Sequence, residues 1–119
     1  IGDNVFIGPF VEIQKNVKIG KNSKIQSHTF ICENTLIEDN VFIGHGVMFV
    51  NDRFKNGLRA SQKNNKLEDT VIGENVNIGS NSTILPVNIC KNVTIGAASL
   101  VAKDINLKGV YYGVPAKKS

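Results

Sequence analysis

One feature constrains this chain more than any other: a large apolar residue recurs at every sixth position along most of its length. The first series is Ile1, Ile7, Ile13, Ile19, Ile25, Ile31, Ile37, Ile43 and Phe49. The period returns at Ile72, Ile78 and Ile84, and again at Ile89, Ile95 and Val101. A period of six is neither the 3.6-residue period of an amphipathic helix nor the heptad of a coiled coil. The pattern therefore indicates a repeat protein rather than a helical bundle.

The repeat also predicts which side chains are buried. A smaller residue stands two places before most of these positions, as Val5 does before Ile7 and Val41 before Ile43. Side chains two apart along a short strand point to the same face, so both sets are expected to point inward. The residues between them are then expected to point outward, among them Phe6, Phe30 and Phe42.

The remaining positions of the hexad describe a corner. Glycine often follows the isoleucine, as at Gly8 and Gly44, and asparagine often precedes the smaller inward residue, as at Asn16 and Asn40. Glycine and asparagine both tolerate positive φ, so the chain can turn sharply once per repeat. Short parallel strands that turn every six residues fit a solenoid whose coils have three sides and about 18 residues. The sequence predicts an all-β parallel β-helix of about five coils over residues 1–104.

Two segments break the repeat, and a third follows it. Residues 50–66 form a polar excursion between Phe49 and the next coil, and a loop of this length inside a regular repeat domain suggests a functional role. The side from Ile84 to Ile89 is one residue short and contains Pro86. After Asp104 the period disappears, and residues 105–119 are expected to form an irregular tail.

These motifs resemble those of the hexapeptide-repeat acyltransferases over about 100 residues. The pattern [Ile/Val]-Gly-x-Asn-[Val/Ser]-x carries the resemblance. The resemblance implies a left-handed β-helix, whereas the general rule for crossovers between parallel strands favours a right-handed one. It also implies a homotrimer with active sites at subunit boundaries. The segment "TIGAASLVAKDI" and the ending "YYGVPAKKS" are similar to the part of that family that binds acetyl-coenzyme A. The cofactor-binding residues that this implies are Gly79, Gly96, Ala97, Ala98, Ser99, Lys103, Pro115, Ala116 and Lys117.

The middle segment, "IEDNVFIGHGVMFVNDRF", looks like the subgroup that acetylates the 3-amino group of nucleotide-linked deoxyamino sugars. Related enzymes that acetylate hydroxyl groups have a histidine where this chain reads Val50-Asn51-Asp52, which favours an amine acceptor. The resemblance implies catalytic roles for Asn51, His45 and Asp52, because amide, imidazole and carboxylate groups can orient an amine or accept its proton. Substrate contacts are expected from Glu33, His28 and Arg53, with Glu33 at the corner equivalent to that of His45, one coil earlier.

Other functions stay open at this level. Acetylation of a hydroxyl or of another small acceptor is one alternative, and a non-catalytic β-helix scaffold is another. Zinc enzymes built on this repeat use three histidines, and the chain has two, so no metal is expected. The net charge of +4 comes from separated lysine groups, which suit phosphorylated ligands better than nucleic acid. No apolar run reaches the length of a membrane helix, and no signal peptide is visible, so a cytoplasmic location is expected.

Overall fold

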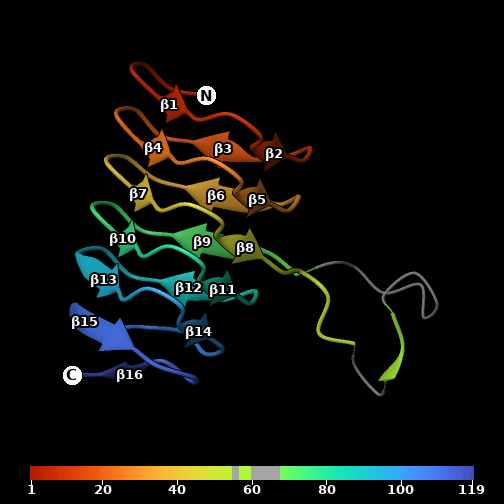
Figure 1. Cartoon of the computed structure of the whole chain (residues 1–119), viewed down its shortest axis with the longest axis vertical. Coiled ribbons are helices and arrows are strands. Elements are labelled where there is room, and N and C mark those ends of the chain that lie inside the picture. Colours follow the sequence, from red (N-terminus) through yellow and green to blue (C-terminus); the bar gives the residue numbers. More distant parts are fainter. Residues whose placement is uncertain (55–56, 60–67) are drawn as a thin grey trace.

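The chain winds into a three-sided solenoid whose coils stack along one axis. The structure, a computed structural model, describes residues 1–54, 57–59 and 68–119. Figure 1 shows the coils following one another from the N-terminal end to the C-terminal end, with the segment after β8 (Met48–Phe49) projecting sideways from the stack. The predicted parallel β-helix of hexapeptide repeats, with about five turns, is confirmed.

Each side of the prism is one β-sheet. Sheet A contains β1 (Phe6–Ile7), β4 (Lys24–Ile25), β7 (Phe42–Ile43), β10 (Asn77–Ile78), β13 (Val93–Ile95), β15 (Gly109–Tyr112) and β16 (Lys117–Lys118). Sheet B contains β2 (Glu12–Ile13), β5 (Phe30–Ile31), β8, β11 (Thr83–Ile84) and β14 (Leu100–Val101). Sheet C contains β3 (Lys18–Ile19), β6 (Thr35–Ile37), β9 (Thr70–Ile72) and β12 (Asn88–Ile89).

The register of the sheets shows why the hexad is so regular. Ile7 pairs with Ile25, and Ile25 pairs with Ile43, so equivalent residues lie 18 positions apart in parallel strands. Ile78 pairs with Ile95, only 17 positions later, because the side that contains Pro86 is one residue short. The isoleucines therefore form columns inside the prism. Ile25, Ile43 and Ile78 are completely buried, as the alternation of the strands predicts.

Burial weakens in the first coil. Ile1 is 77% exposed and Ile7 is 38% exposed, although both occupy inward positions. Each of these side chains has a neighbouring coil on one side only. Of the outward phenylalanines, Phe6 and Phe42 are exposed as predicted, at 48% and 40%, whereas Phe30 is half-buried and packs against the core.

The corners have the backbone conformation that the asparagines predict. Among the described residues, eight asparagines have positive φ, all between 56° and 64°, at Asn4, Asn16, Asn22, Asn34, Asn40, Asn75, Asn81 and Asn92. His28 has the same conformation, with φ of 63°, and Gly46 continues the series at 65°. The corner place of His28 is therefore explained by backbone geometry.

The C-terminal segment differs from the irregular tail expected after Asp104. Ile105 is buried and bridges to Ile89, which extends sheet C, and β15 pairs in parallel with β13, which extends sheet A. The chain then reverses, and β16 pairs antiparallel with β15. The solenoid thus continues past residue 104, because backbone pairing persists where the hexad signal is lost.

The excursion predicted at residues 50–66 begins where expected, since β8 ends at Phe49. The chain rejoins the solenoid at Thr70, the first residue of β9. Residues 55–56 and 60–66 of that prediction lie outside the described residues. Within the described part of the chain, no helix is long and apolar enough to cross a membrane.

Candidate functional site

The predicted site residues fall mainly on two corners of the prism. The A–B corner, where the chain passes from sheet A to sheet B, comprises residues 8–10, 26–28, 44–46, 79–81 and 96–98. The B–C corner, where the chain passes from sheet B to sheet C, comprises residues 14–16, 32–34, 50–52, 85–86 and 102–104. The A–B corner precedes each strand of sheet B and the B–C corner follows it. One chain therefore holds two separate groups of candidate residues, at the opposite ends of these strands.

His45 stands on the A–B corner between two serines of the neighbouring coils. Its ring Nδ1 is 2.9 Å from the Oγ of Ser27 in the preceding coil. Its backbone N–H donates to the Oγ of Ser80 in the following coil, at 3.1 Å. The sequence prediction missed both serines, although Ser27 can be found by aligning the chain at a period of 18. His45 itself is exposed, so its imidazole is accessible to a ligand.

His28 lies on the same corner, one coil before Gly46. Its ring centroid is 5.1 Å from that of Phe10, at an interplanar angle of 32°. Phe10 is 80% exposed and, like His28, has positive φ. The two rings thus form an exposed aromatic pair near His45, a position compatible with the ligand contact predicted for His28.

A run of small residues continues the A–B corner beyond His45. Gly79 lies in the coil that follows Gly44, and Gly96, Ala97 and Ala98 lie in the next coil. Ala97 and Ala98 are exposed. We call this run, formed by Gly79, Gly96, Ala97 and Ala98, the small-residue strip. It places four of the predicted cofactor residues on the same corner as His45.

The two glycines of the strip also have a packing role. A Cβ on Gly79 would lie 2.5 Å from the backbone nitrogen of Ala97. A Cβ on Gly96 would lie 2.9 Å from the Cβ of Tyr112. Real Cβ atoms do not approach other atoms this closely, so glycine is required here for the coils to stack.

The side chain of Ser99 has a structural role. Its side chain is buried, donates from Oγ to the carbonyl of Gly96 at 2.7 Å and accepts from the backbone N–H of Gly113 at 3.1 Å. The hydroxyl therefore joins the last coil to the C-terminal hairpin. A cofactor contact through this side chain is not supported, because the group faces the interior.

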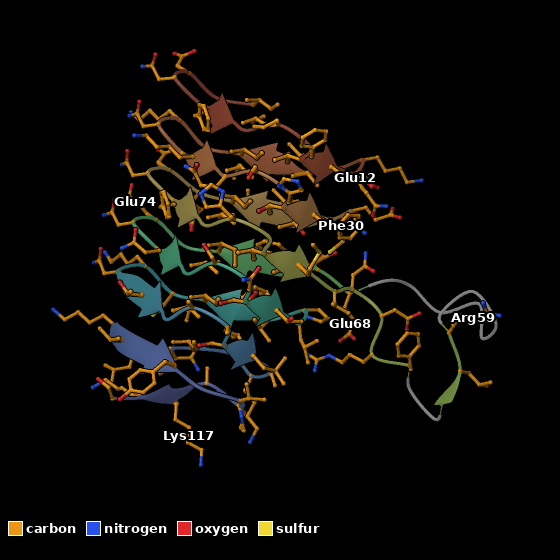
Figure 2. The ribbon with its side chains drawn as sticks, in the orientation of Figure 1. Glu12, Phe30, Arg59, Glu68, Glu74 and Lys117 are labelled. Carbon is orange, nitrogen blue, oxygen red and sulfur yellow. The ribbon has the colours of Figure 1, made fainter. Side chains whose placement is uncertain are left out.

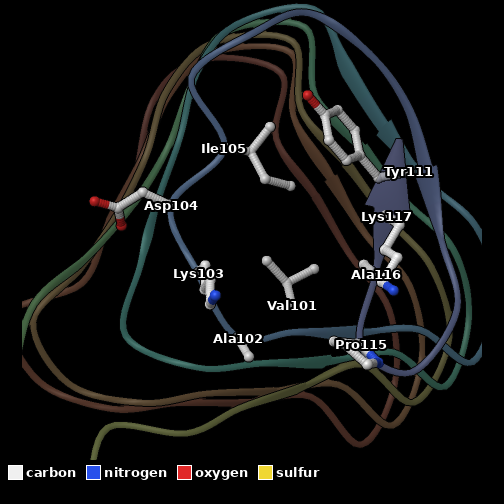
Figure 3. Close-up of a pocket in the computed structure, with 9 residues that line it drawn as sticks. All are labelled: Val101, Ala102, Lys103, Asp104, Ile105, Tyr111, Pro115, Ala116 and Lys117. Atoms are coloured by element: carbon white, nitrogen blue, oxygen red, sulfur yellow. The ribbon is translucent and has the colours of Figure 1, made fainter. Parts of the chain in front are cut away.

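The other predicted cofactor residues surround a cavity at the C-terminal end of the prism. The cavity has a volume of about 280 Å³, and Lys103, Pro115, Ala116 and Lys117 line it together with apolar residues such as Val101. Figure 3 shows these residues viewed along the prism, with Lys103 and Lys117 on either side of Val101. The backbone N–H of Ala116 donates to the carbonyl of Leu100, which fixes the hairpin beside the strand that follows the small-residue strip. The hairpin residue Ala116 thus lies beside the strand that follows the strip, whereas Lys103 lies on the B–C corner.

Asn51 and Asp52 lie on the B–C corner, away from His45. The amide of Asn51 is half-buried, and its Nδ2 donates to the backbone carbonyl of Glu33 at 3.5 Å. Asp52 accepts from the backbone N–H of Phe54 at 3.0 Å, as a residue that begins a loop often does. Glu33 was expected at the corner equivalent to that of His45, but it lies on this other corner. Its carboxylate is 3.9 Å from the ammonium of Lys15.

Arg53 connects the two segments that break the repeat. Its guanidinium donates from Nη2 to the backbone carbonyl of Pro86 at 2.7 Å, and its Nε is 3.3 Å from a carboxylate oxygen of Glu68. Figure 2 shows Glu68 beside the solenoid, at the base of the excursion, with Arg59 farther out. These two contacts hold Arg53 at the base of the excursion, and the substrate contact predicted for it stays a prediction.

The described residues hold no cluster of three histidine, cysteine or acidic side chains that could bind a metal ion. Cys32 is buried on the B–C corner, and burial raises the pKa of its thiol above the ordinary value. The thiol contacts the Oγ of Thr35 at 3.6 Å and packs as a small apolar side chain.

Comparison with protein families identifies the repeat. The profile described as "Bacterial transferase hexapeptide (six repeats)" matches residues 1–33, and "Hexapeptide repeat of succinyl-transferase" matches residues 69–101. The chain belongs to the hexapeptide-repeat transferase family. One match precedes the excursion and the other follows it, so the repeat resumes after the excursion.

Two curated proteins match part of the chain. The bifunctional protein GlmU of Buchnera aphidicola is 42% identical over 50 residues, which is 41% of this chain and 11% of the relative. The chloramphenicol acetyltransferase of Klebsiella aerogenes is 41% identical over 66 residues, 55% of this chain and 30% of the relative. The matches thus cover about a tenth to a third of the length of these relatives.

Several solved structures have the same fold. A maltose O-acetyltransferase from Clostridium difficile 630 superposes with a TM-score of 0.86 and 27% identity, over 100% of this chain and 67% of that chain. An acetyltransferase from Vibrio cholerae O1, complexed with acetyl-coenzyme A, superposes with a TM-score of 0.87 and 23% identity, over 99% of this chain and 68% of that chain. A perosamine N-acetyltransferase from Caulobacter crescentus, complexed with coenzyme A and GDP-perosamine, superposes with a TM-score of 0.74 and 18% identity, over 100% of this chain and 52% of that chain.

Proposed function

We propose that this protein is an acetyl-coenzyme A dependent acetyltransferase that uses His45 to activate a hydroxyl group of a sugar-like acceptor. One observation carries the proposal: His45 shares the A–B corner with the small-residue strip that continues toward the C-terminal hairpin. Acetyl-coenzyme A supplies the acetyl thioester when it is bound. The family membership and the acetyl-coenzyme A complex of the Vibrio protein support the same choice of acyl donor.

The residues of the corner fit a long, narrow and anionic ligand. Exposed Ala97 and Ala98 leave room for a thin pantetheine arm along the corner. Beyond this corner, Lys117 of the C-terminal hairpin and Lys103 of the B–C corner are exposed cations that suit the phosphate groups. With the arm running along the strip, the thioester end would be directed toward His45.

The chemistry assigned to His45 is that of a general base. The imidazole takes the proton of the acceptor hydroxyl as the acceptor oxygen bonds to the acetyl carbon. The carbon–sulfur bond breaks, and His45 returns the proton to the departing sulfur. Holding the two reactants side by side supplies a further share of the rate acceleration.

A hydroxyl acceptor is favoured because a hydroxyl needs such a base more than a neutral amine does. The similarity to the Clostridium maltose O-acetyltransferase, at 27% identity, supports this acceptor class. The second candidate is N-acetylation of the 3-amino group of a nucleotide-linked deoxyamino sugar. Asn51 favours it, because it stands where the related hydroxyl-acetylating enzymes have a histidine.

The arrangement of the corners favours a homotrimer. Asn51 and Asp52 lie on the opposite edge of sheet B from His45, so one ligand would contact both groups most simply between neighbouring subunits. The outward Phe6, Phe42 and Met48 are 40% to 48% exposed in the single chain, which suits burial against a second copy. Sedimentation equilibrium tests this assembly, and a monomer at micromolar concentration would contradict it.

An acceptor panel tests the proposed reaction. The purified chain is mixed with acetyl-coenzyme A and with matched pairs of sugars that carry either a hydroxyl or an amine at one position, free or linked to a nucleotide. Release of the free thiol and the mass of the product are followed. Turnover of the hydroxyl members supports the leading proposal, while turnover of the amines alone supports the second candidate. No turnover by the folded protein across the panel would contradict both.

A further inference from the structure

We propose that Ser27 is a positioning residue that holds the imidazole of His45 in the tautomer able to act as a base. This inference rests on the proposed function, since it assigns a role to the contact between Ser27 and His45. The inference is that the Nδ1–H of His45 donates a hydrogen bond and that the hydroxyl of Ser27 accepts it.

The fold fixes the distance between these two residues. Ser27 and His45 occupy the same place in consecutive coils, and the backbone N–H of Gly46 donates to the carbonyl of Ser27 at 3.0 Å. On the other side, the N–H of Asn81 donates to the carbonyl of His45 at 2.9 Å. The backbones of three coils are thus tied together at this corner. The 2.9 Å contact between the serine Oγ and the imidazole Nδ1 follows from the stacking of the coils.

The ring needs its proton on one particular nitrogen. A neutral imidazole carries one proton, so Nε2 can accept a proton only if Nδ1 carries the existing one. The Oγ of Ser27 can accept the Nδ1–H, and within the described residues the structure gives this oxygen no other partner. After Nε2 takes a proton, the same hydrogen bond persists and stabilises the charged ring. The serine hydroxyl can also donate to an unprotonated Nδ1, and only the arrangement in which Oγ accepts supports both the basic tautomer and the protonated product.

Ser80 provides a matched comparison within the same corner. It occupies the equivalent place one coil later, but its Oγ accepts from the backbone N–H of His45, and no contact with the ring is seen among the described residues. Removal of the Ser80 hydroxyl changes the support of the backbone, whereas removal of the Ser27 hydroxyl changes the partner of the ring. Comparison of the two separates a tautomer effect from a general loss of the serine contacts.

The first experiment needs no substrate. Ring-nitrogen NMR signals are recorded on the ¹⁵N-labelled full chain at a pH where the imidazoles are neutral, and His45→Gln assigns the His45 signals, since His28 is the second histidine. We expect a wild-type ring protonated on Nδ1. We expect Ser27→Ala to shift the ring toward the Nε2–H tautomer that free imidazole side chains prefer, while Ser27→Thr and Ser80→Ala keep the wild-type pattern. A wild-type ring protonated on Nε2 would overturn the proposal.

The second experiment measures turnover with the best hydroxyl acceptor. We expect Ser27→Ala to lower kcat about tenfold, with KM within about twofold, because a hydrogen bond to a group that becomes charged is lost. Ser27→Thr, which keeps the hydroxyl, should restore most of the rate. An unchanged kcat in Ser27→Ala would overturn the role of Ser27. If the wild-type chain turns over no acceptor, the proposed function fails, and the NMR result alone decides whether Ser27 holds the tautomer.

Discussion

Removal of the Arg53 side-chain contacts should loosen the base of the excursion. In the structure the guanidinium joins Pro86 on one side and Glu68 on the other, so it closes the two ends of the segment against the next coil. Arg53→Met keeps much of the apolar stem and removes both polar contacts. The matched variant Glu68→Gln removes the charge of one partner and leaves the contact with Pro86.

The structure indicates how large each effect should be. The bond to the Pro86 carbonyl is short, at 2.7 Å, and Pro86 is buried, so a charged hydrogen bond of about 2 kcal/mol is reasonable. The ion pair with Glu68 is partly exposed, at 31% and 40% of the two side chains, and contributes about 0.5 kcal/mol after screening. We therefore expect Arg53→Met to cost about 2 kcal/mol and Glu68→Gln no more than about 1 kcal/mol.

Amide hydrogen exchange measures this loss at the place where it occurs. The N–H of Val50 donates to the carbonyl of Ile84 at 2.8 Å and reports on the first residue of the excursion. A loss of about 2 kcal/mol in opening free energy corresponds to roughly thirtyfold faster exchange in Arg53→Met. The amide of Gly8, in the first coil, should be unaffected and serves as the internal control. Equal exchange rates at Val50 in the two variants would refute the assignment of Arg53 as the residue that closes the excursion.

Three further predictions concern the stacked corners and the buried thiol. Gly79→Ala should lower the free energy of unfolding in urea by about 2 kcal/mol, because its new Cβ meets the backbone of Ala97; stability equal to wild type would contradict the stacking argument. Asn22→Val should cost about 1–2 kcal/mol at a φ of 61°, whereas Asn22→Gly should be nearly neutral; equal melting temperatures for the two variants would count against it. Cys32 is 1% exposed, and burial raises the pKa of its thiol, so Cys32 should react with a disulfide reagent at neutral pH only in urea. Half-buried Cys90 should react in the folded protein. Rapid labelling of Cys32 in the folded protein would be the contrary result.

The repeat could be predicted from the sequence because each position of the hexad has one physical task. Inward isoleucines such as Ile43 are buried in the prism, and corner asparagines such as Asn40 have the positive φ that the turn requires. The strand at Gly109–Tyr112 could not be predicted from the hexad. It joins sheet A through backbone hydrogen bonds to β13 and has lost the spacing that marks the earlier coils.

The site was predicted less completely, because its contacts link residues far apart in the sequence. The contact between Ser27 and His45 follows from a period of 18, so it could have been found from the repeat alone. The contact between Arg53 and Pro86 could not, since it spans 33 positions and depends on both the excursion and the shortened side. His45 and Asn51 stand six positions apart, so the predicted three-sided coil already assigns them to successive corners.

The rate of acetyl transfer to a hydroxyl acceptor in His45→Gln, compared with wild type, tests the central claim most directly. Glutamine keeps a polar side chain on the exposed corner and cannot act as a general base, and removal of such a base typically costs about 10²- to 10⁴-fold. We expect kcat to fall within that range while acetyl-coenzyme A still binds and the melting temperature stays near that of the wild type. Wild-type turnover in His45→Gln would contradict the account, as would a folded wild-type protein that binds no acetyl-coenzyme A.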